Sequence, residues 1–208
     1  MRPINVVCCR VLLLLCVCGW GCGDASESAS QIRVIGFPTS RMNYHIAEQE
    51  ASNWCWAACV QMALSARGIE VSQEEIIRNT FGGELRDEPG GPEEILANLN
   101  GNMKDRAGRT IHIWGSCQEG PPSLEQLRSQ FNRGIPLIIG YDVPWQSVGH
   151  AAVVTAVIYR ERDGGSEIVK VLVRDPSPAY RATLGKRELT PAEFRQIFVH
   201  YFVTSLEQ

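Results

Sequence analysis

The chain has 208 residues and a mass of 23.1 kDa, which suits one domain with a substantial core rather than two small domains. Its net charge is -3, and it contains neither a run of Lys and Arg nor interleaved basic and aromatic residues, so nothing indicates a nucleic-acid partner. With 44% hydrophobic and 21% charged residues, the composition is that of a globular protein.

The N-terminus has the pattern of an export signal. Arg2 and Arg10 flank an apolar stretch, residues 11–18, which is too short to span a bilayer but long enough for the hydrophobic region of a signal peptide. We therefore expect residues 1–22 to be a signal peptide and the protein to be exported.

The end of this segment leaves two outcomes open. Gly21-Cys22 resembles the end of a bacterial lipoprotein signal, in which the cysteine is acylated, although the usual aliphatic residue three places earlier is Gly19 here. The alternative is plain cleavage near Ala25 or Ala29. The product is then either a periplasmic or outer-membrane lipoprotein with a lipid anchor at Cys22, or a secreted protein.

Most of the cysteines belong to this segment. Five of the eight precede residue 23, so the folded part keeps Cys55, Cys59 and Cys117. A disulfide framework is therefore not expected. A single bond between Cys59 and Cys117 stays open, because exported proteins meet an oxidising environment.

Residues 23–36 begin with a small, polar stretch and are predicted to form a linker, and the folded domain is predicted to span residues 37–208. The first part of this domain is expected to be mainly helical. Apolar residues at helical spacing, capping boxes and a Gly-Pro-Glu start predict helices over 53–67, 72–79, 91–99 and 123–134. The first of these helices is rich in alanine, which indicates a buried central helix.

After Gly134 the pattern changes to alternating or continuous apolar runs. These predict strands over 135–141, 151–159, 168–173 and 198–203, with a short helix starting at Thr190-Pro191 before the last strand. Helices followed by an antiparallel sheet, without alternating βαβ units, indicate an α+β fold. The glycine- and proline-rich stretches 82–91 and 115–122 are predicted to be loops that shape a cleft.

Cys55 is the candidate nucleophile. It lies in the stretch Gln-Glu-Ala-Ser-Asn-Trp-Cys-Trp-Ala-Ala-Cys, which leads directly into the first predicted helix. At the first turn of a helix, unpaired backbone N–H groups and the positive end of the dipole stabilise a thiolate, the form that attacks a carbonyl carbon. Gln49, six residues earlier, is placed to donate an amide N–H to the oxygen of a tetrahedral intermediate.

A catalytic cysteine needs an imidazole to take its proton, and His150 is the candidate. It leads into the predicted strand 151–159, and Gly149 leaves room for a substrate to approach from outside. The other three histidines, which lie on a loop before Cys55, on a polar face and within the last strand, are His45, His112 and His200.

The predicted hairpin supplies a carboxylate. Strands 151–159 and 168–173 are joined by a tight-turn signal, Arg-Asp-Gly-Gly, so partners should have residue numbers that sum to about 327. This register places Asp175 opposite Ala152 and on the face of His150, within the roughly 7–8 Å that separates diagonal neighbours. There the carboxylate orients the imidazole and stabilises its protonated form.

This assignment depends on the register. A slip of one residue would turn Asp175 to the other face of the sheet. Asp142, which follows the strand ending at Tyr141, is the alternative carboxylate.

In order and spacing, Gln49, Cys55-Trp56, Gly149-His150 and Asp175-Pro176 resemble the papain-like cysteine peptidases. The Asn-Trp-Cys-Trp-Ala-Ala stretch is similar to the effector cysteine proteases of plant-pathogenic bacteria, and the His-strand and Asp-Pro pattern to the bacteriocin-leader-processing peptidases. The likeness covers roughly Gln49 to the C-terminus. Papain itself has Asn at the position of Asp175 and a disulfide-forming Cys at that of Ser52, and the shorter Cys-to-His separation here implies trimmed substrate-binding loops.

The resemblance implies a fold and an activity. The expected fold is α+β and papain-like, with Cys55 at the N-terminus of a helical subdomain that packs on an antiparallel sheet carrying His150 and Asp175. The substrate, a peptide or protein, would lie in the groove between them. The expected activity is peptide-bond hydrolysis through an acyl-enzyme, with Gln49 in the oxyanion hole, with no metal or organic cofactor, and with the protein acting as a monomer.

Other interpretations stay open. The same fold could serve an amidase or acyltransferase acting on cell-wall or other small peptides, or a binding module that no longer catalyses. A thiol-redox protein using Cys55 and Cys59 is disfavoured because the pair lacks the two-residue gap of the thioredoxin motif. A zinc site of Cys55, Cys59 and His150 would lack a convincing fourth ligand.

Overall fold

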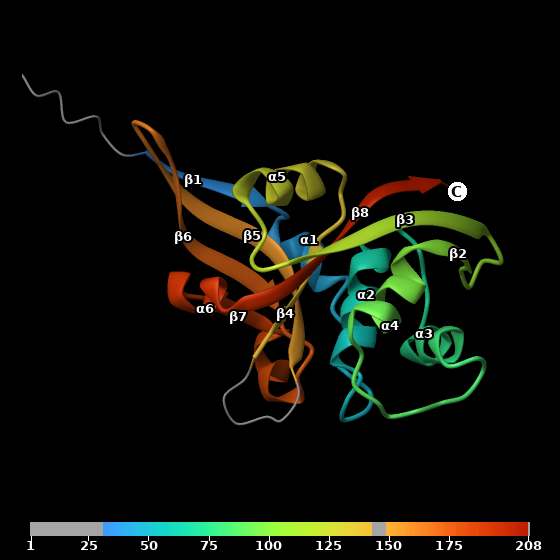
Figure 1. The fold of residues 1–208 in the computed structure, drawn as a ribbon. Helices are drawn as coiled ribbons and strands as arrows, with labels where there is room; N and C mark the ends of the chain where they lie inside the picture. The colour runs from blue at the N-terminus through green and yellow to red at the C-terminus, as the bar shows by residue number, and fades with distance from the viewer. Residues whose placement is uncertain (1–30, 143–148, 208) are drawn as a thin grey trace, which may run out of the picture.

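The computed structural model describes residues 31–142 and 149–207, and in these residues one antiparallel sheet of eight strands carries helices on both faces (Figure 1). The predicted signal peptide 1–22, its Cys22 anchor and residues 23–30 of the linker lie outside the described residues. None of the described helices is long and apolar enough to cross a membrane.

The strands form the order β2-β3-β8-β4-β5-β6-β7, and β1 pairs with the far half of β5, beyond the end of β4. Their bounds are β1 Gln31–Gly36, β2 Gly101–Lys104, β3 Thr110–Glu119, β4 Leu137–Tyr141, β5 His150–Arg162, β6 Gly165–Arg174, β7 Lys186–Leu189 and β8 Ile197–Glu207.

The helices divide between the two faces of the sheet. Helices α2, α3 and α4 lie together on one side, and α5 lies on the other (Figure 1). Their bounds are α1 Thr39–Asn43, α2 Cys55–Ser65, α3 Gln73–Thr80, α4 Pro92–Leu99, α5 Leu124–Asn132 and α6 Pro191–Arg195, with a 3-10 helix, η1, at Pro178–Thr183.

The core has one apolar cluster on each face, because successive strand residues point to opposite sides. On β5, Ala151 and Val153 pack with α2 to α4, whereas Ala152 and Val154 pack on the face that α5 and α6 cover. Helix α2 is buried along eight of its eleven residues, as its alanine content predicts. Helices on an antiparallel sheet confirm the predicted α+β fold class.

The predicted hairpin register is confirmed. Tyr159 pairs with Ile168 near the turn, and Val153 pairs with Arg174 at the other end, with two irregularities between them. Continued by one residue, this register brings Asp175 opposite Ala152, so that the carboxylate reaches the start of β5.

Two expectations about the sheet are wrong. Residues 31–36 of the predicted linker form β1, so residue 37 is too late a start for the domain. The predicted loop 115–122 is also wrong, because β3 extends through residues 115–119 of it. The first part of the domain is mainly helical as expected, but it also contributes β2 and β3 to the sheet. Strands β2 and β7 have four residues each. Strands β1 and β3 are stabilised by pairing with β5 and β8, which are distant in the chain, and local patterns do not record such partners.

Gly36 at the end of β1 tests this pairing. Its φ is +141°, and a Cβ there would lie 2.4 Å from the Ala156 Cα of β5. We expect Gly36→Ala to destabilise the protein by about 1–3 kcal/mol in urea unfolding, through strain and overlap together. The control is Gly164→Ala, where φ is +99° but a Cβ meets no atom within 4 Å. Equal costs for the two variants would contradict the close approach of β1 to β5.

Candidate active site

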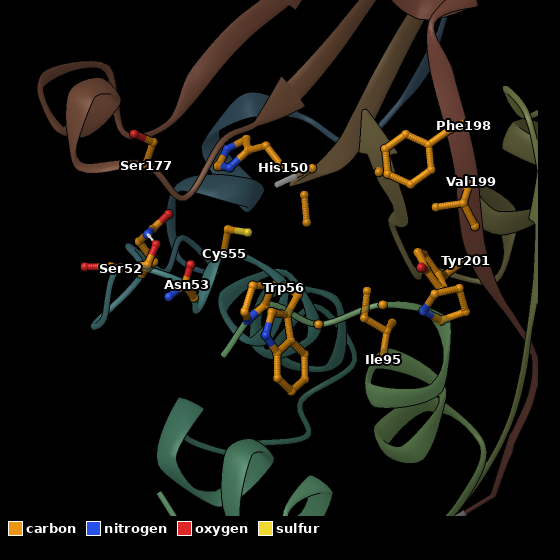
Figure 2. Close-up of a pocket in the computed structure, with 18 residues that line it drawn as sticks. Ser52, Asn53, Cys55, Trp56, Ile95, His150, Ser177, Phe198, Val199 and Tyr201 are labelled. Carbon is orange, nitrogen blue, oxygen red and sulfur yellow. Dashed lines mark hydrogen bonds between the residues drawn. The ribbon is translucent and has the colours of Figure 1, made fainter. Parts of the chain in front are cut away.

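Cys55 opens α2 at the edge of a groove of about 650 Å³. It is the first residue of the helix, so the N–H groups of the first turn have no partner within the helix. The positive end of the helix dipole therefore lies at the groove. His150 lies across the same groove from Cys55 (Figure 2). The groove lining also includes Gln49, Ser52, Asn53, Trp56, Gly90, Gly91, Gly149 and Ser177.

His150 is the first residue of β5 and is 8% exposed. Its Nε2 lies 2.7 Å from Oδ1 of Asp175, which leaves Nδ1 as the ring nitrogen available to the nucleophile. Burial opposes the imidazolium most strongly, but the hydrogen bond to Asp175 and the interaction with Cys55 outweigh it and raise the pKa of His150 to about 9. The site therefore favours a protonated imidazole beside the sulfur.

Asp175 directly follows β6 and is 2% exposed. Oδ1 accepts the His150 bond and a hydrogen bond from the Ser177 backbone N–H at 2.9 Å, and Oδ2 accepts one from the Tyr141 hydroxyl at 2.9 Å. Burial disfavours the carboxylate, but these donors and the His150 charge hold the pKa of Asp175 below its ordinary value. Asp175 is thus an anion at neutral pH, aimed at the imidazole.

Gln49 lies on the loop before α2, which is tied to the loop of Asp175. Its backbone N–H donates to the Pro176 carbonyl at 2.9 Å. Its side-chain amide donates to the carbonyls of Ala51 at 2.9 Å and Ser52 at 2.8 Å. The amide therefore lies in the groove beside the first turn of α2, and one N–H has to leave its carbonyl to meet an oxyanion.

The remaining histidines and the alternative carboxylate lie away from this arrangement. His45 bonds to Ser65 and His200 to the Gly120 carbonyl, and burial lowers the pKa of both. His112 stacks on the exposed Trp114. Asp142 is exposed.

The other cysteines make no bond to one another. Cys59 is fully buried in the core behind Cys55, and burial raises its thiol pKa well above the ordinary value. Cys59 and Cys117 are both free, so the open disulfide alternative does not hold. Within residues 31–142 and 149–207, no three His, Cys, Asp or Glu side chains gather closely enough to hold a metal ion, and this includes Cys55, Cys59 and His150.

The groove continues past Cys55 and His150 between α4 and β8. Ile95, Phe198, Val199 and Tyr201 line this part (Figure 2). The ring of Phe198 lies over Gly140 and Gly149, where an added Cβ would come within 3.1 Å and 2.9 Å of it. This part of the groove is therefore lined mainly by apolar side chains.

Two residues in contact with Asp175 escaped sequence reasoning. Tyr141 ends β4 with its hydroxyl on Oδ2 of Asp175, and Arg187 on β7 places Nη1 3.6 Å from the same oxygen. The strand run ending at Tyr141 was recognisable, but nothing in the sequence around Arg187 distinguishes it from a surface arginine.

Comparison with known proteins supports this reading of the fold. A search of curated proteins finds no significant match. Among solved structures, the chain is similar to the peptidase domain of Streptococcus ComA, a bifunctional ABC transporter involved in a quorum-sensing pathway, with a TM-score of 0.51 and 12% identity over 76% of this chain and 96% of that one. At that identity the likeness is one of fold. The model of the Peptidase_C39 like family matches residues 41–200, and the chain therefore belongs to this family of papain-like cysteine peptidases.

Proposed function

We propose that the protein is an exported thiol peptidase that hydrolyses peptide bonds through an acyl-enzyme on Cys55. The observation that carries this proposal is the 2.7 Å contact of His150 with the buried Asp175, in the groove that Cys55 faces from the first turn of α2. A nucleophile, a base and a group that orients the base are the set that acyl transfer requires. Export rests on the N-terminal sequence pattern alone.

The geometry supports a two-stage reaction. The Cys55 thiolate attacks the carbonyl carbon of the scissile amide, and the charge moves to the carbonyl oxygen. The Cys55 backbone N–H and the Gln49 amide donate to that oxygen. His150 gives its proton to the leaving amine as the C–N bond breaks, which leaves a thioester. His150 then takes a proton from water as the water attacks the thioester. The C–S bond breaks, the carboxylic acid is released, and the Cys55 thiolate and the His150 imidazolium are restored.

A peptide-library digestion tests the proposal. Wild type is expected to cleave a defined subset of peptides, and Cys55→Ala to cleave none. The matched control is Cys117→Ala, which removes another free cysteine outside the groove lining and should keep wild-type activity. Cleavage by Cys55→Ala would contradict the assignment of the nucleophile. If the protein cleaves a muropeptide amide but no library peptide, the peptidase proposal is wrong and the amidase alternative takes its place.

Chemical labelling separates an enzyme from a binding module. A thiolate held beside an imidazolium should react with iodoacetamide at pH 6 faster than a free cysteine does. If Cys55 reacts no faster than free cysteine and no peptide is cleaved, the catalytic proposal fails and the binding module takes its place.

The pH profile has a predictable basic limb. The imidazolium of His150 must be present to protonate the leaving amine, and its pKa is raised to about 9. We expect kcat/KM to hold up to about pH 9 and to fall above it, as His150 loses its proton. Measured kcat/KM that already falls near pH 6.5, the ordinary value for histidine, would contradict the Asp175 and Cys55 contacts.

Gln49→Ala is expected to lower kcat by roughly 10²-fold and to change KM little, because an oxyanion donor acts only once charge develops. Steady-state kinetics give both constants. Gln61→Ala, which removes an amide on α2 that bonds to Gln73 away from the groove lining, is the matched control. An effect on KM alone would assign Gln49 to substrate binding instead.

A further inference from the structure

Asp175 is held on one oxygen by the catalytic histidine and on the other by a separate chain of donors. Oδ1 faces His150 Nε2 at 2.7 Å, and Oδ2 accepts the Tyr141 hydroxyl at 2.9 Å. Arg187 Nη1 lies 3.6 Å from Oδ2 and donates to the Tyr141 oxygen at 2.7 Å. A guanidinium is thus joined to the catalytic carboxylate through a tyrosine.

The tyrosine can only act as a donor toward Asp175. It is 6% exposed, and burial together with the neighbouring carboxylate raises the pKa of Tyr141, so its hydroxyl stays protonated. Because Arg187 has no acceptor atom, it occupies a lone pair of the hydroxyl and the Tyr141 proton goes to Oδ2. The ring of Tyr141 also meets the His150 ring edge to face, with centroids 5.6 Å apart, so one side chain orients both members of the pair.

Arg187 is itself fixed by the next element. Its Nη2 donates to Oε1 of Glu193 at 2.8 Å, while Oε2 of Glu193 closes the capping box of α6 on the backbone N–H of Thr190. The guanidinium carbon lies 5.3 Å from the centroid of the Tyr141 ring. The helix cap, the arginine and the tyrosine therefore form one rigid support behind Asp175.

We propose that Tyr141 and Arg187 are positioning residues of the catalytic site, which hold the Asp175 carboxylate in its orientation and moderate its pull on the His150 proton. The inference rests on the proposed function, since it assigns the support of that same pair. Neither residue is part of the groove lining, so Arg187 acts through Tyr141 and Asp175, and Tyr141 acts through Asp175 and through its ring contact with His150.

The sign of the effect follows from the charges. The hydroxyl proton and the guanidinium each take up part of the negative charge of Asp175. Without them the carboxylate attracts the imidazolium proton more strongly, and His150 keeps that proton to a higher pH. A more basic imidazole is a weaker acid toward the leaving amine, and an Asp175 that is free to rotate orients it less well. The titratable and charged groups that face the pair are Cys55 and Cys59 on α2, Tyr141 on β4, Tyr180 on η1, Arg187 on β7 and Glu193 on α6.

The test compares variants that keep and remove each donor. Tyr141→Phe keeps the ring and removes the hydroxyl, Arg187→Gln removes the charge, and Arg187→Lys restores it. The matched control is Arg162→Gln, whose exposed ion pair with Glu167 lies at the tip of the β5–β6 hairpin. The measurements are an NMR titration of the His150 ring proton in the whole protein, and the pH dependence of kcat and KM.

The expected result is an upward move of the His150 titration by roughly one pH unit in Tyr141→Phe and Arg187→Gln, the size of a hydrogen bond to a charged group. Arg187→Lys should move it by less than half as much, and Arg162→Gln should leave it at the wild-type value. In Tyr141→Phe and Arg187→Gln, kcat should fall while KM stays near the wild-type value.

Two outcomes overturn the inference. One is an unchanged His150 titration in folded Tyr141→Phe, which is close in shape to wild type and is expected to fold. The other is equal behaviour of Arg187→Gln and Arg187→Lys, which would make the charge irrelevant. The titration needs no substrate, so a wild type that cleaves no peptide contradicts the proposed function and leaves this test intact.

Discussion

Asp175→Ala is expected to lower kcat/KM by roughly 10²–10⁴-fold and to destabilise the fold by about 3–5 kcal/mol. The substitution leaves His150 without the group that orients it, so the imidazole loses both its position and its charge partner. It also leaves the Tyr141 hydroxyl and the Arg187 guanidinium beside an empty, buried site. Steady-state kinetics and chemical unfolding measure the two effects.

The controls separate these two effects. Asp142→Ala makes the same substitution at an exposed carboxylate after β4 and should change neither quantity appreciably. Asp175→Asn keeps an acceptor for His150 but turns an N–H₂ toward donors, so it should retain more activity than Ala and still lose stability. Equal activity of Asp175→Ala and wild type would remove Asp175 from the mechanism.

The stability effect of Asp175 should depend on pH. The pKa of this carboxyl is lowered in the folded protein, so its contribution to stability is fully present above its ordinary value of 3.8 and is lost as the pH falls through the folded value. The gap in unfolding free energy between wild type and Asp175→Ala should therefore narrow under acidic conditions.

Trp56→Ala is expected to cost about 3–5 kcal/mol of unfolding free energy, the range for a large aromatic side chain removed from a core. Trp56 is 1% exposed and packs edge to face on Phe81, with centroids 6.5 Å apart. Its Nε1 donates to the Glu88 carbonyl at 3.2 Å, and the backbone of Gly90 lies so close that a Cβ there would fall 2.4 Å from the indole. The side chain thus supports both the core and the loop that forms one wall of the groove.

Two measurements follow for this variant. The midpoint of urea unfolding should fall, and KM should rise because Gly90 and Gly91 line the groove and lose their support. The matched control is Trp114→Ala, at a tryptophan on β3 that is 42% exposed, where a loss below about 1 kcal/mol is expected. Similar losses for the two variants would contradict the packing of Trp56.

The three side chains of the candidate site come from different elements of the fold. Cys55 belongs to a buried helix, His150 begins the long strand β5, and Asp175 follows the strand that pairs with it. The hairpin alone delivers the carboxylate to the imidazole, since the register of β5 and β6 sets their separation. Packing of α2 on β5 then brings the Cys55 sulfur to the same groove as His150. The arrangement therefore depends on the apolar core between α2 and the sheet.

Sequence patterns alone determined the parts of the site that depend on local rules. The position of Cys55 follows from a helix start, and the partnership of His150 with Asp175 follows from the period of two in a hairpin joined by a tight turn. The buried character of α2 follows from its composition. In each case the relevant interaction is with a near neighbour in the chain or is set by a turn.

The tertiary structure alone decided the rest, because the partners are distant in sequence. Strand β1 exists through its pairing with β5, more than 100 positions away, and its own residues are mostly exposed. The engagement of the Gln49 amide by its own loop also needed coordinates. So did the support of Asp175 by Tyr141 and Arg187, because a buried carboxylate is held by whichever donors the folded chain brings within hydrogen-bonding distance, and chain spacing does not encode that distance.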